Sequence, residues 1–350
     1  MAYTTIDDPT AYFQCTLYAG NNGTQTITHT GHSDLQADMI WGKARNDSAA
    51  HFRIDSVRGV SKRFKQNADA ESTVSTGITA IGSDSFALGN DGDFNDNSIN
   101  YATWNWKAGT SFTNDASGTG IGSLDSSGSV STTAGFSIIS WTNAGSGVAT
   151  VAHGLGVTPK MIIIKSRNEA AGWLTYHEAI GNTKALFLNT TGAEDDNAEL
   201  FNDTSPTSTV FTTGITGLLT GGSNLIAYCF AEKQGYSKFG SYVGNGNANG
   251  TFIYTGFKPA FVMTKPSSKT GEWFMIDNKR DPSNYVRRRL KANSNAAENT
   301  DDNQDFDILS NGFKARRSAG DWNSSGDTFI YMAFAEQPFV SSSVVPATAR

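Results

Sequence analysis

An apolar stretch that occurs three times along the chain constrains the fold more than any other feature. The clearest copy, FIYMAFAEQPF, runs from Phe329 to Phe339, and a near-copy, LIAYCFAEKQG, runs from Leu225 to Gly235. A weaker copy, INYATWNWKAG, runs from Ile99 to Gly109. Similar stretches spaced by roughly 100 residues are typical of a chain built from tandem modules. The sequence therefore predicts three related modules.

Further elements recur in the same order in each predicted module. An apolar strand ends in a lysine, an aromatic residue opens the next strand, and a later turn ends in a glutamate. The lysines are Lys43, Lys165 and Lys265, the aromatic residues are Phe52, Trp173 and Trp273, and the glutamates are Glu71, Glu194 and Glu298. Two modules also contain an aspartate followed three residues later by an arginine, Asp55/Arg58 and Asp277/Arg280, where the middle module has His177 and Ile180.

Short apolar runs separated by turn residues every 8–12 residues or so predict an all-β chain. The first module alone has about eight such runs, which is typical of a sandwich or jelly roll. We expect three tandem β-sandwich, jelly-roll-like modules of about 100 residues each. The expected order is an N-terminal lead at 1–11, modules at 12–109, 134–235 and 236–339, a flexible Gly/Ser-rich linker at 110–133, and a C-terminal tail at 340–350.

Charge and hydropathy exclude several classes of partner. The formal net charge is -6, and the basic run from Arg287 to Lys291 alternates along a predicted strand, so we expect no nucleic-acid partner. No apolar run is long enough for a spanning helix, which predicts no membrane insertion. The first residues lack the charged and apolar regions of a signal peptide. Cys15 and Cys229 lie in different modules, and we expect both to be buried thiols.

Three groups of residues could suggest a metal site. His29 and His32 have no third ligand nearby, so two exposed histidines are the favoured interpretation. Asp91, Asp93, Asn95 and Asn97 begin like a calcium loop, but Asp96 and Ala102 stand where that loop requires glycine and glutamate. A turn held by its own Asx side chains explains the pattern without an ion. The acidic loop from Asp301 to Asp307 is expected to be solvated, with calcium as the alternative.

We find no catalytic or cofactor motif. The chain has no nucleophile elbow, metalloprotease helix, phosphate loop or dinucleotide fingerprint. The Asp55/Arg58 and Asp277/Arg280 pairs are expected to be structural ion pairs that fix the turn after a strand. The three lysines are expected to be structural or to protect a sheet edge. The prediction is a protein that is not an enzyme and that holds no cofactor and no metal.

The last strand of the third module shows a simple alternation. Tyr331, Ala333 and Ala335 share one face, and Met332 and Phe334 share the other. We expect one face to line a core and the other to meet a neighbour.

The turns before the final strands contain the best candidates for ligand contact. Asp321, Trp322 and Asn323 in the third module match Asp93, Phe94 and Asn95 in the first. An aromatic ring beside amide and carboxylate groups could bind a host glycan. The alternative is that Trp322 caps the end of the sandwich.

Four stretches carry a resemblance to a known group of proteins. They are FIYMAFAEQPF, YTGFKPAFVMTK from Tyr254 to Lys265, FDILSNGFK from Phe306 to Lys314, and the N-terminal MAYTTIDDPTAYFQ. They resemble a repeat found in virion structural and tail-appendage, tail fibre-like proteins of marine bacteriophages such as cyanophages. The resemblance covers nearly the whole chain and is strongest in the third module.

This resemblance implies a non-enzymatic virion component, made in the host cytoplasm. The first hypothesis is a tail fibre or tail appendage that forms a homotrimer, contacts other virion proteins and attaches to a host cell-surface glycan or protein. The alternatives are a capsid-decorating or vertex protein and a polysaccharide-degrading tailspike.

Overall fold

The computed structural model describes residues 3–143, 147–214, 221–299, 305–318, 320–343 and 345–347. Within these ranges the chain is all-β, as predicted, with several sheets and only single-turn helical segments. These segments are η1 Pro9–Ala11, α1 Gly92–Asn95, α2 Ala116–Thr119, η2 Glu178–Ile180 and α3 Ala198–Phe201. None of the described helices is long and apolar enough to cross a membrane.

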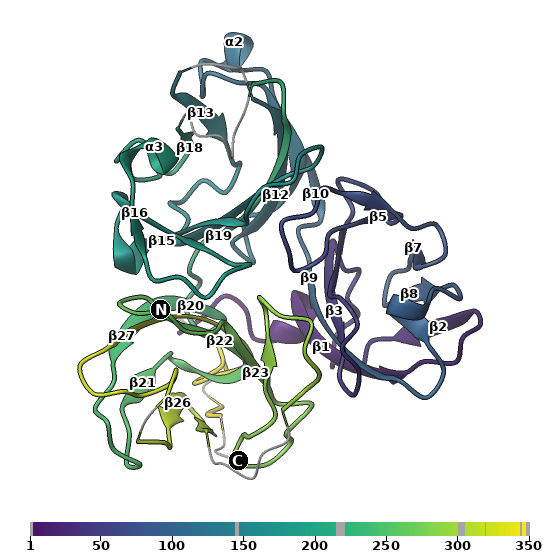
Figure 1. Ribbon diagram of the computed structural model, residues 1–350, viewed down its shortest axis with the longest axis vertical. Helices are drawn as coiled ribbons and strands as arrows, with labels where there is room; N and C mark the ends of the chain where they lie inside the picture. The colour runs from purple at the N-terminus through teal and green to yellow at the C-terminus, as the bar shows by residue number, and fades with distance from the viewer. Residues whose placement is uncertain are drawn as a thin grey trace.

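The strands gather into three lobes around a common centre (Figure 1). Each lobe turns one large sheet towards the other two lobes. In the first lobe this sheet has the order β1-β9-β3-β4, with β1 Phe13–Ala19, β9 Asn100–Trp106, β3 Met39–Ala44 and β4 Phe52–Asp55. In the second lobe the corresponding strands are β12 Phe136–Thr142, β19 Asn224–Phe230, β14 Met161–Ser166 and β15 Leu174–His177. In the third lobe they are β20 Ser237–Val243, β27 Thr328–Pro338, β22 Phe257–Pro266 and β23 Phe274–Asp277.

The order of strands is therefore the same in the three large sheets. In each, the last strand of the lobe lies between the first strand and the strand that ends in lysine. The second sheet is extended by β10 Thr110–Asn114, β11 Ser126–Ser131, β16 Lys184–Phe187 and β17 Asp195–Asp196, and the third by β24 Leu290–Lys291.

A smaller sheet packs on the outer side of each large sheet (Figure 1). The first consists of β2 Gln25–Thr28, β8 Ser85–Leu88 and β7 Ile78–Ile81. The second consists of β13 Ala149–Ala152 and β18 Val210–Thr213, and the third of β21 Phe252–Tyr254, β26 Gly312–Ala315 and β25 Phe306–Leu309. A separate short pair, β5 Lys62–Arg63 and β6 Ser72–Thr73, completes the first lobe.

Four hydrophobic cores hold these layers together. Three of them lie between the large and small sheet of one lobe each. The fourth lies at the centre and takes side chains from all three lobes, among them Trp104, Trp106, Phe230, Phe261 and Phe334. Burial of each such ring stabilises the fold by about 2–3 kcal/mol, so the central core stabilises the contacts between the lobes.

The alternation of β27 confirms the prediction for this strand. Tyr331, Ala333 and Ala335 belong to the core inside the third lobe, while Met332 and Phe334 belong to the central core. The strand is buried on both faces because sheets or lobes lie on both sides of it.

The sequence alignment of the first repeat is wrong by two residues. It sets Ile99 against Leu225 and Phe329, but the register of the large sheets sets Tyr101 there. Met39 pairs with Trp106, Met161 with Phe230 and Phe261 with Phe334, so these pairs mark the equivalent positions. A shift of two residues keeps every side chain on the same face, which is why the pattern alone did not reveal it.

The prediction of a flexible linker at 110–133 is also wrong. This segment forms β10 and β11, which pair with each other and extend the sheet of the second lobe through β12. Small residues permit the close pairing: a Cβ on Gly128 would lie only 1.8 Å from the carbonyl oxygen of Ile138. Both cysteines are buried and free, as expected.

Candidate functional site

The turn before the last strand of the third lobe is a packing element. Trp322 is 3% exposed; its ring stacks on Phe274 at 4.1 Å between centroids and meets Phe306 edge-on at 4.8 Å. The amide of the fully buried Asn323 donates to Asn245 Oδ1 and to two backbone carbonyls. Asp321 is partly exposed and accepts a hydrogen bond from a backbone N–H.

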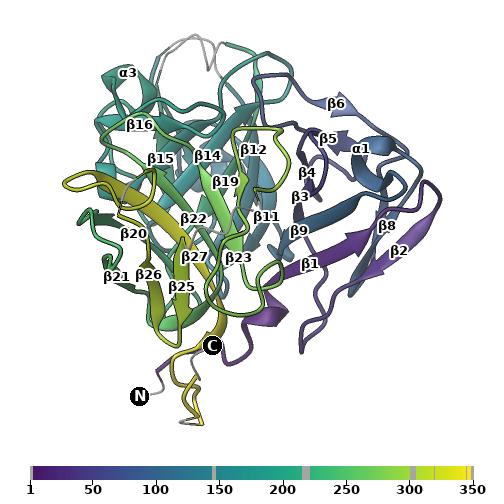
Figure 2. The same ribbon diagram turned by 60° about the horizontal axis from the view of Figure 1, so that its bottom comes forward.

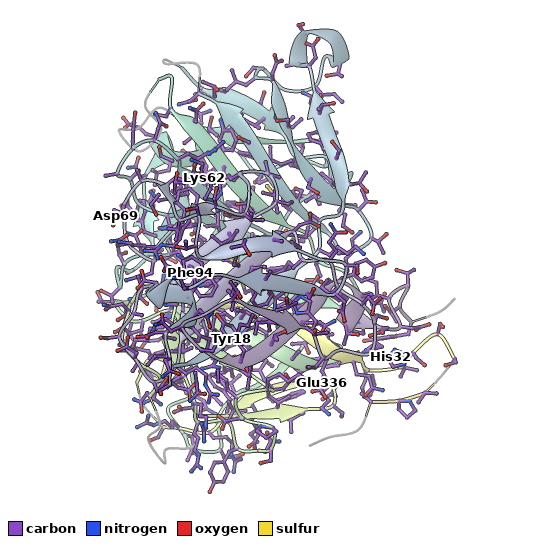
Figure 3. The ribbon with its side chains drawn as sticks, turned by 90° about the vertical axis from the view of Figure 1, so that its right-hand side faces the viewer. Tyr18, His32, Lys62, Asp69, Phe94 and Glu336 are labelled. Carbon is purple, nitrogen blue, oxygen red and sulfur yellow. The ribbon has the colours of Figure 1, made fainter. Side chains whose placement is uncertain are left out.

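The matching turn of the first lobe has the same construction. Phe94 is buried and stacks on Phe52 at 4.3 Å (Figure 3). The amide of Asn95 donates to Asn21 Oδ1 and to two backbone carbonyls, those of residues 23 and 89. Asp93 forms an ion pair with Arg63 at 2.6 Å.

These contacts correct the glycan hypothesis for both turns. Neither Trp322 nor Phe94 has an exposed ring face on which a sugar could stack, because each ring closes the core of its lobe. The structure favours the capping alternative. Sequence reasoning missed the role of the two asparagines, whose side chains hold the neighbouring loops; the repeat of an aromatic residue followed by asparagine was the signal available.

The metal candidates also have other partners. His29 is buried against Thr16, contrary to the expectation that it is exposed, while the side chain of His32 lies on the surface beside Asp8. The carboxylate of Asp91 caps α1 by accepting from the N–H of Asp93. Among the described residues no group of three or more acidic, histidine or cysteine side chains could hold an ion.

The acidic loop from Asp301 to Asp307 is described only from Asp305 onwards. Asp305 is buried between Arg289 and Arg317, and burial raises the pKa of its carboxyl. The rest of the loop, residues 301–304, on which the calcium alternative depends, lies outside the described residues.

A cavity opens between the first and third lobes on the face shown in Figure 3, where His32 and Glu336 are labelled. Its wall also contains Cys15 and Lys279. Burial raises the pKa of the Cys15 thiol far above its usual value, and Glu336 is paired with Lys258 at 3.3 Å. A protonated thiol is a poor nucleophile, so Cys15 is not an activated nucleophile in this cavity.

The two repeated aspartate–arginine pairs are structural ion pairs, as predicted. Arg58 Nε lies 2.5 Å from Asp55 Oδ2, and Arg280 Nε lies 2.5 Å from Asp277 Oδ2; all four side chains are fully buried. Each aspartate also accepts the backbone N–H of its arginine and so closes the turn.

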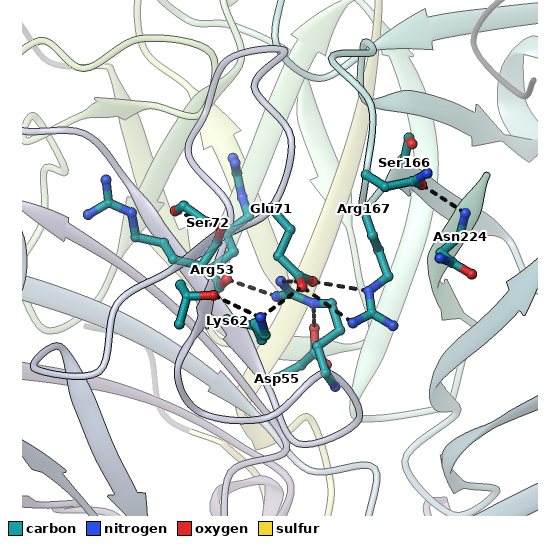
Figure 4. Close-up of polar contacts among 12 residues, drawn as sticks. Arg53, Asp55, Lys62, Glu71, Ser72, Ser166, Arg167 and Asn224 are labelled. Carbon is teal, nitrogen blue, oxygen red and sulfur yellow. Dashed lines mark hydrogen bonds and ion pairs between the residues drawn. The ribbon is translucent and has the colours of Figure 1, made fainter.

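We call the contact between two lobes a seam. At two seams, the glutamate that ends the next turn binds both the arginine of its own aspartate–arginine pair and an arginine of the neighbouring lobe. Glu71 of the first lobe accepts from Arg58 and from Arg167 of the second lobe (Figure 4). Glu298 of the third lobe accepts from Arg280 and, at 2.9 Å, from Arg45 of the first lobe.

The backbones of the three repeated glutamates follow one cyclic pattern. The N–H groups of Glu71, Glu194 and Glu298 donate to the carbonyls of Arg167, Ser267 and Arg45 respectively. The first lobe is thus joined to the second, the second to the third, and the third back to the first. All three seams use the same backbone contact.

The difference in the middle module follows from the chemistry at the centre of each seam. Tyr228 of the second lobe donates to Asp55 at 2.7 Å, and Trp104 of the first lobe donates to Asp277 at 3.1 Å. At the equivalent place in the third lobe stands Met332, which has no hydrogen to donate. His177 occupies the aspartate position opposite it and lies 3.1 Å from the carbonyl oxygen of Tyr331. The carbonyl oxygen of Tyr331 can only accept a hydrogen bond. A histidine, which can donate one, therefore stands where the other two lobes have an aspartate, which accepts.

The three repeated lysines are also structural. Lys43, Lys165 and Lys265 are buried, and their strands lie inside the sheets, so they do not protect an edge. Each ammonium donates to two backbone carbonyls. One of the two carbonyls bonded by Lys165, and one of the two bonded by Lys265, belongs to a neighbouring lobe. Burial lowers the pKa of all three lysines to about 8.

Exposed aromatic side chains occur on the small sheet of the third lobe. Phe252 is 44% exposed and Tyr254 is 51% exposed, on either side of the buried Ile253 in β21. Sequence reasoning missed this pair, although the alternation in TFIYTG was visible in the sequence.

Comparison with known proteins gives one match. A family model described as a domain of unknown function, DUF7483, matches residues 8–338. A search of curated proteins and a search of solved structures each found no significant match. The matched range contains all three large sheets, so the family unit is the complete set of lobes. The chain belongs to the DUF7483 family.

Proposed function

We propose that this chain is a non-enzymatic structural component of a bacteriophage virion, a tail fibre or tail-appendage module that contributes to host attachment. The observation that carries the proposal is the cyclic set of seams around one central core. The buried charged and amide side chains of the chain hold its loops and lobes together, which suits a rigid protein that presents a surface to a host cell.

The proposal includes three tandem β-sandwich modules within 12–109, 134–235 and 236–339. Support comes from the common strand order and from equivalent cross-strand pairs in the three small sheets. These pairs are Ile27–Phe86, Val151–Phe211 and Ile253–Phe313. In each pair the phenylalanine is fully buried in the core of its own lobe.

The particle position can be tested by immunolabelling of purified phage that encodes the chain. Labels confined to the tail, together with inhibition of phage adsorption by the purified protein, are the expected results. Labels spread over the capsid in tens to hundreds of copies would replace this proposal with the capsid-decorating one, and particles without the protein would refute both.

Two further parts of the proposal have their own measurements. The homotrimer predicts a mass in solution of three chains, against 37.4 kDa for one chain. Incubation of the protein with polysaccharide from the host surface should release no reducing ends; release would favour the polysaccharide-degrading alternative.

A further inference from the structure

The outer face of β21 in the third lobe exposes two aromatic rings. Phe252 and Tyr254 are two residues apart, so their side chains leave the strand on the same side, about 7 Å apart along it. Ile253 between them points inwards and is 5% exposed. Figures 1 and 2 show β21 and β26 on the side of their lobe that faces away from the centre.

The other two lobes show that the fold does not require these rings. The cross-strand pairs with phenylalanine set Ile27 and Val151 at the position of Ile253. The neighbours of Ile27 are Thr26 and Thr28, both exposed, and those of Val151 are Thr150 and Ala152. The aromatic pair is therefore a particular feature of the third lobe. Two half-exposed rings on one face of a strand, where the other lobes have small residues, mark a candidate binding surface.

Polar groups lie beside the rings on the same sheet. Phe252 pairs with Lys314 across the strands, and Lys314 pairs with Asp307 of β25. The Lys314 ammonium donates to Asn249 Oδ1 at 2.6 Å. Hydrogen-bond donors and acceptors thus lie next to an apolar ring, and the carboxylate of Asp307 is also paired with Arg316 at 3.3 Å.

Tyr254 pairs with Gly312, and the ring of Phe252 leans over that glycine. A Cβ on Gly312 would lie 3.2 Å from Cε2 of Phe252 and 2.0 Å from the carbonyl oxygen of Ile253. The hydroxyl of Tyr254 lies 3.4 Å from that of Tyr3, which donates to the carbonyl of Gly256 at 2.7 Å. The Tyr254 ring is therefore held in position before any ligand arrives.

We propose that this face, which we call the β21 face and define by Phe252, Tyr254, Gly312, Lys314 and Asp307, binds a saccharide chain. The apolar C–H faces of successive sugar rings would stack on the two aromatic rings. The hydroxyl groups would exchange hydrogen bonds with the ammonium and carboxylate beside them. The inference rests on the proposed role in host attachment and gives that role a site.

The test compares two double variants, one on the β21 face of the third lobe and one, as a control, at the equivalent positions of the first lobe. F252T/Y254T gives the third lobe the residues of the first, and T26A/T28A changes the equivalent exposed face of the first lobe as the control. The probe is delipidated polysaccharide from host envelopes, immobilised on a sensor surface and titrated with the full chain. Thermal melting should be unchanged in both variants, because all four side chains are exposed.

The expected result is a Kd at least tenfold higher for F252T/Y254T and unchanged for T26A/T28A. Equal affinity of F252T/Y254T and the unaltered chain would overturn the inference, as would failure of the unaltered chain to bind. A solution mass that falls on F252T/Y254T substitution would also overturn it, because the occupant would then be a second copy of the chain.

A parallel arm separates this inference from the proposed function. The unaltered chain and both variants are added to host cells before phage, and adsorption is counted. If the unaltered chain and F252T/Y254T inhibit adsorption equally, saccharide binding by the β21 face is refuted while the attachment role stands. If the chain is absent from the particle and yet binds the polysaccharide through these two rings, the saccharide site stands and the virion role is refuted.

Discussion

Replacement of Phe334 by alanine tests whether one central core joins the three lobes. Phe334 is 1% exposed, and its ring meets Phe13 at 5.0 Å, Trp106 at 5.6 Å and Phe230 at 6.0 Å. These three neighbours come from the first and second lobes, and Phe334 itself comes from the third. The Phe334 side chain of the third lobe therefore contacts residues of both other lobes.

The expected loss follows from what the substitution removes. Truncation of a buried phenylalanine to alanine costs about 3–5 kcal/mol, through lost transfer energy and the cavity left behind. Each ring contact adds about 0.5–1.5 kcal/mol beyond buried area, which places Phe334→Ala at the upper end, near 5 kcal/mol. Phe252→Ala removes the same atoms from an exposed ring and should cost less than about 1 kcal/mol.

Guanidinium denaturation followed by tryptophan fluorescence measures both variants. We expect one transition in the unaltered chain, shifted to lower denaturant by Phe334→Ala and nearly unmoved by Phe252→Ala. A loss below about 1 kcal/mol would contradict the burial of Phe334. Separate transitions, with only one of them shifted, would show that the lobes unfold independently and that the central core does not couple them.

Three other predictions concern the polar contacts. Arg280→Met should cost about 3–5 kcal/mol in denaturant unfolding, because the buried Asp277 loses its ion-pair partner and Glu298 keeps only Arg45 and Arg288. Arg288→Met, on a half-exposed side chain, should cost under about 1 kcal/mol, and equal losses would contradict the assignment. Asn323→Ala should cost about 2–4 kcal/mol by leaving buried groups unpaired, and an unchanged melting temperature would show that water replaces the amide. Burial lowers the pKa of His177 to about 4, so its contribution to stability is complete above pH 6.5, the unfolded value, and declines as the pH falls towards 4; His177→Gln should flatten that part of the pH profile, and identical profiles would refute the assignment.

The repeat allowed the strands, the ion pairs and the two faces of β27 to be predicted from local patterns. Alternation with a period of two identifies which residues share a face, but it leaves the register free by two residues, hence the error at Ile99. Exposure of an aromatic ring depends on what covers it. For Trp322 the polar turn left both ligand contact and capping open, and the structure shows that the ring packs on Phe274, which lies 48 residues earlier in the sequence.

The seams could not be predicted for a related reason. His177 and Tyr331 are 154 residues apart, and nothing in either local sequence indicates that the imidazole of one lies 3.1 Å from the carbonyl oxygen of the other. The sequence alone therefore shows the loss of the aspartate from the middle module without its reason. With both lobes in place, it is an adjustment to a partner that cannot donate a hydrogen bond.

Lobes joined in one polypeptide are free to diverge, and this determines valency. Three identical chains arranged around an axis present any surface three times, but this chain presents the exposed pair Phe252 and Tyr254 once, because its other lobes have threonine or alanine there. Each chain is then monovalent for whatever occupies that surface. Under the proposed attachment role, tight binding to a cell would come from the number of chains that engage together, since linked weak contacts strengthen binding without any new contact within a site.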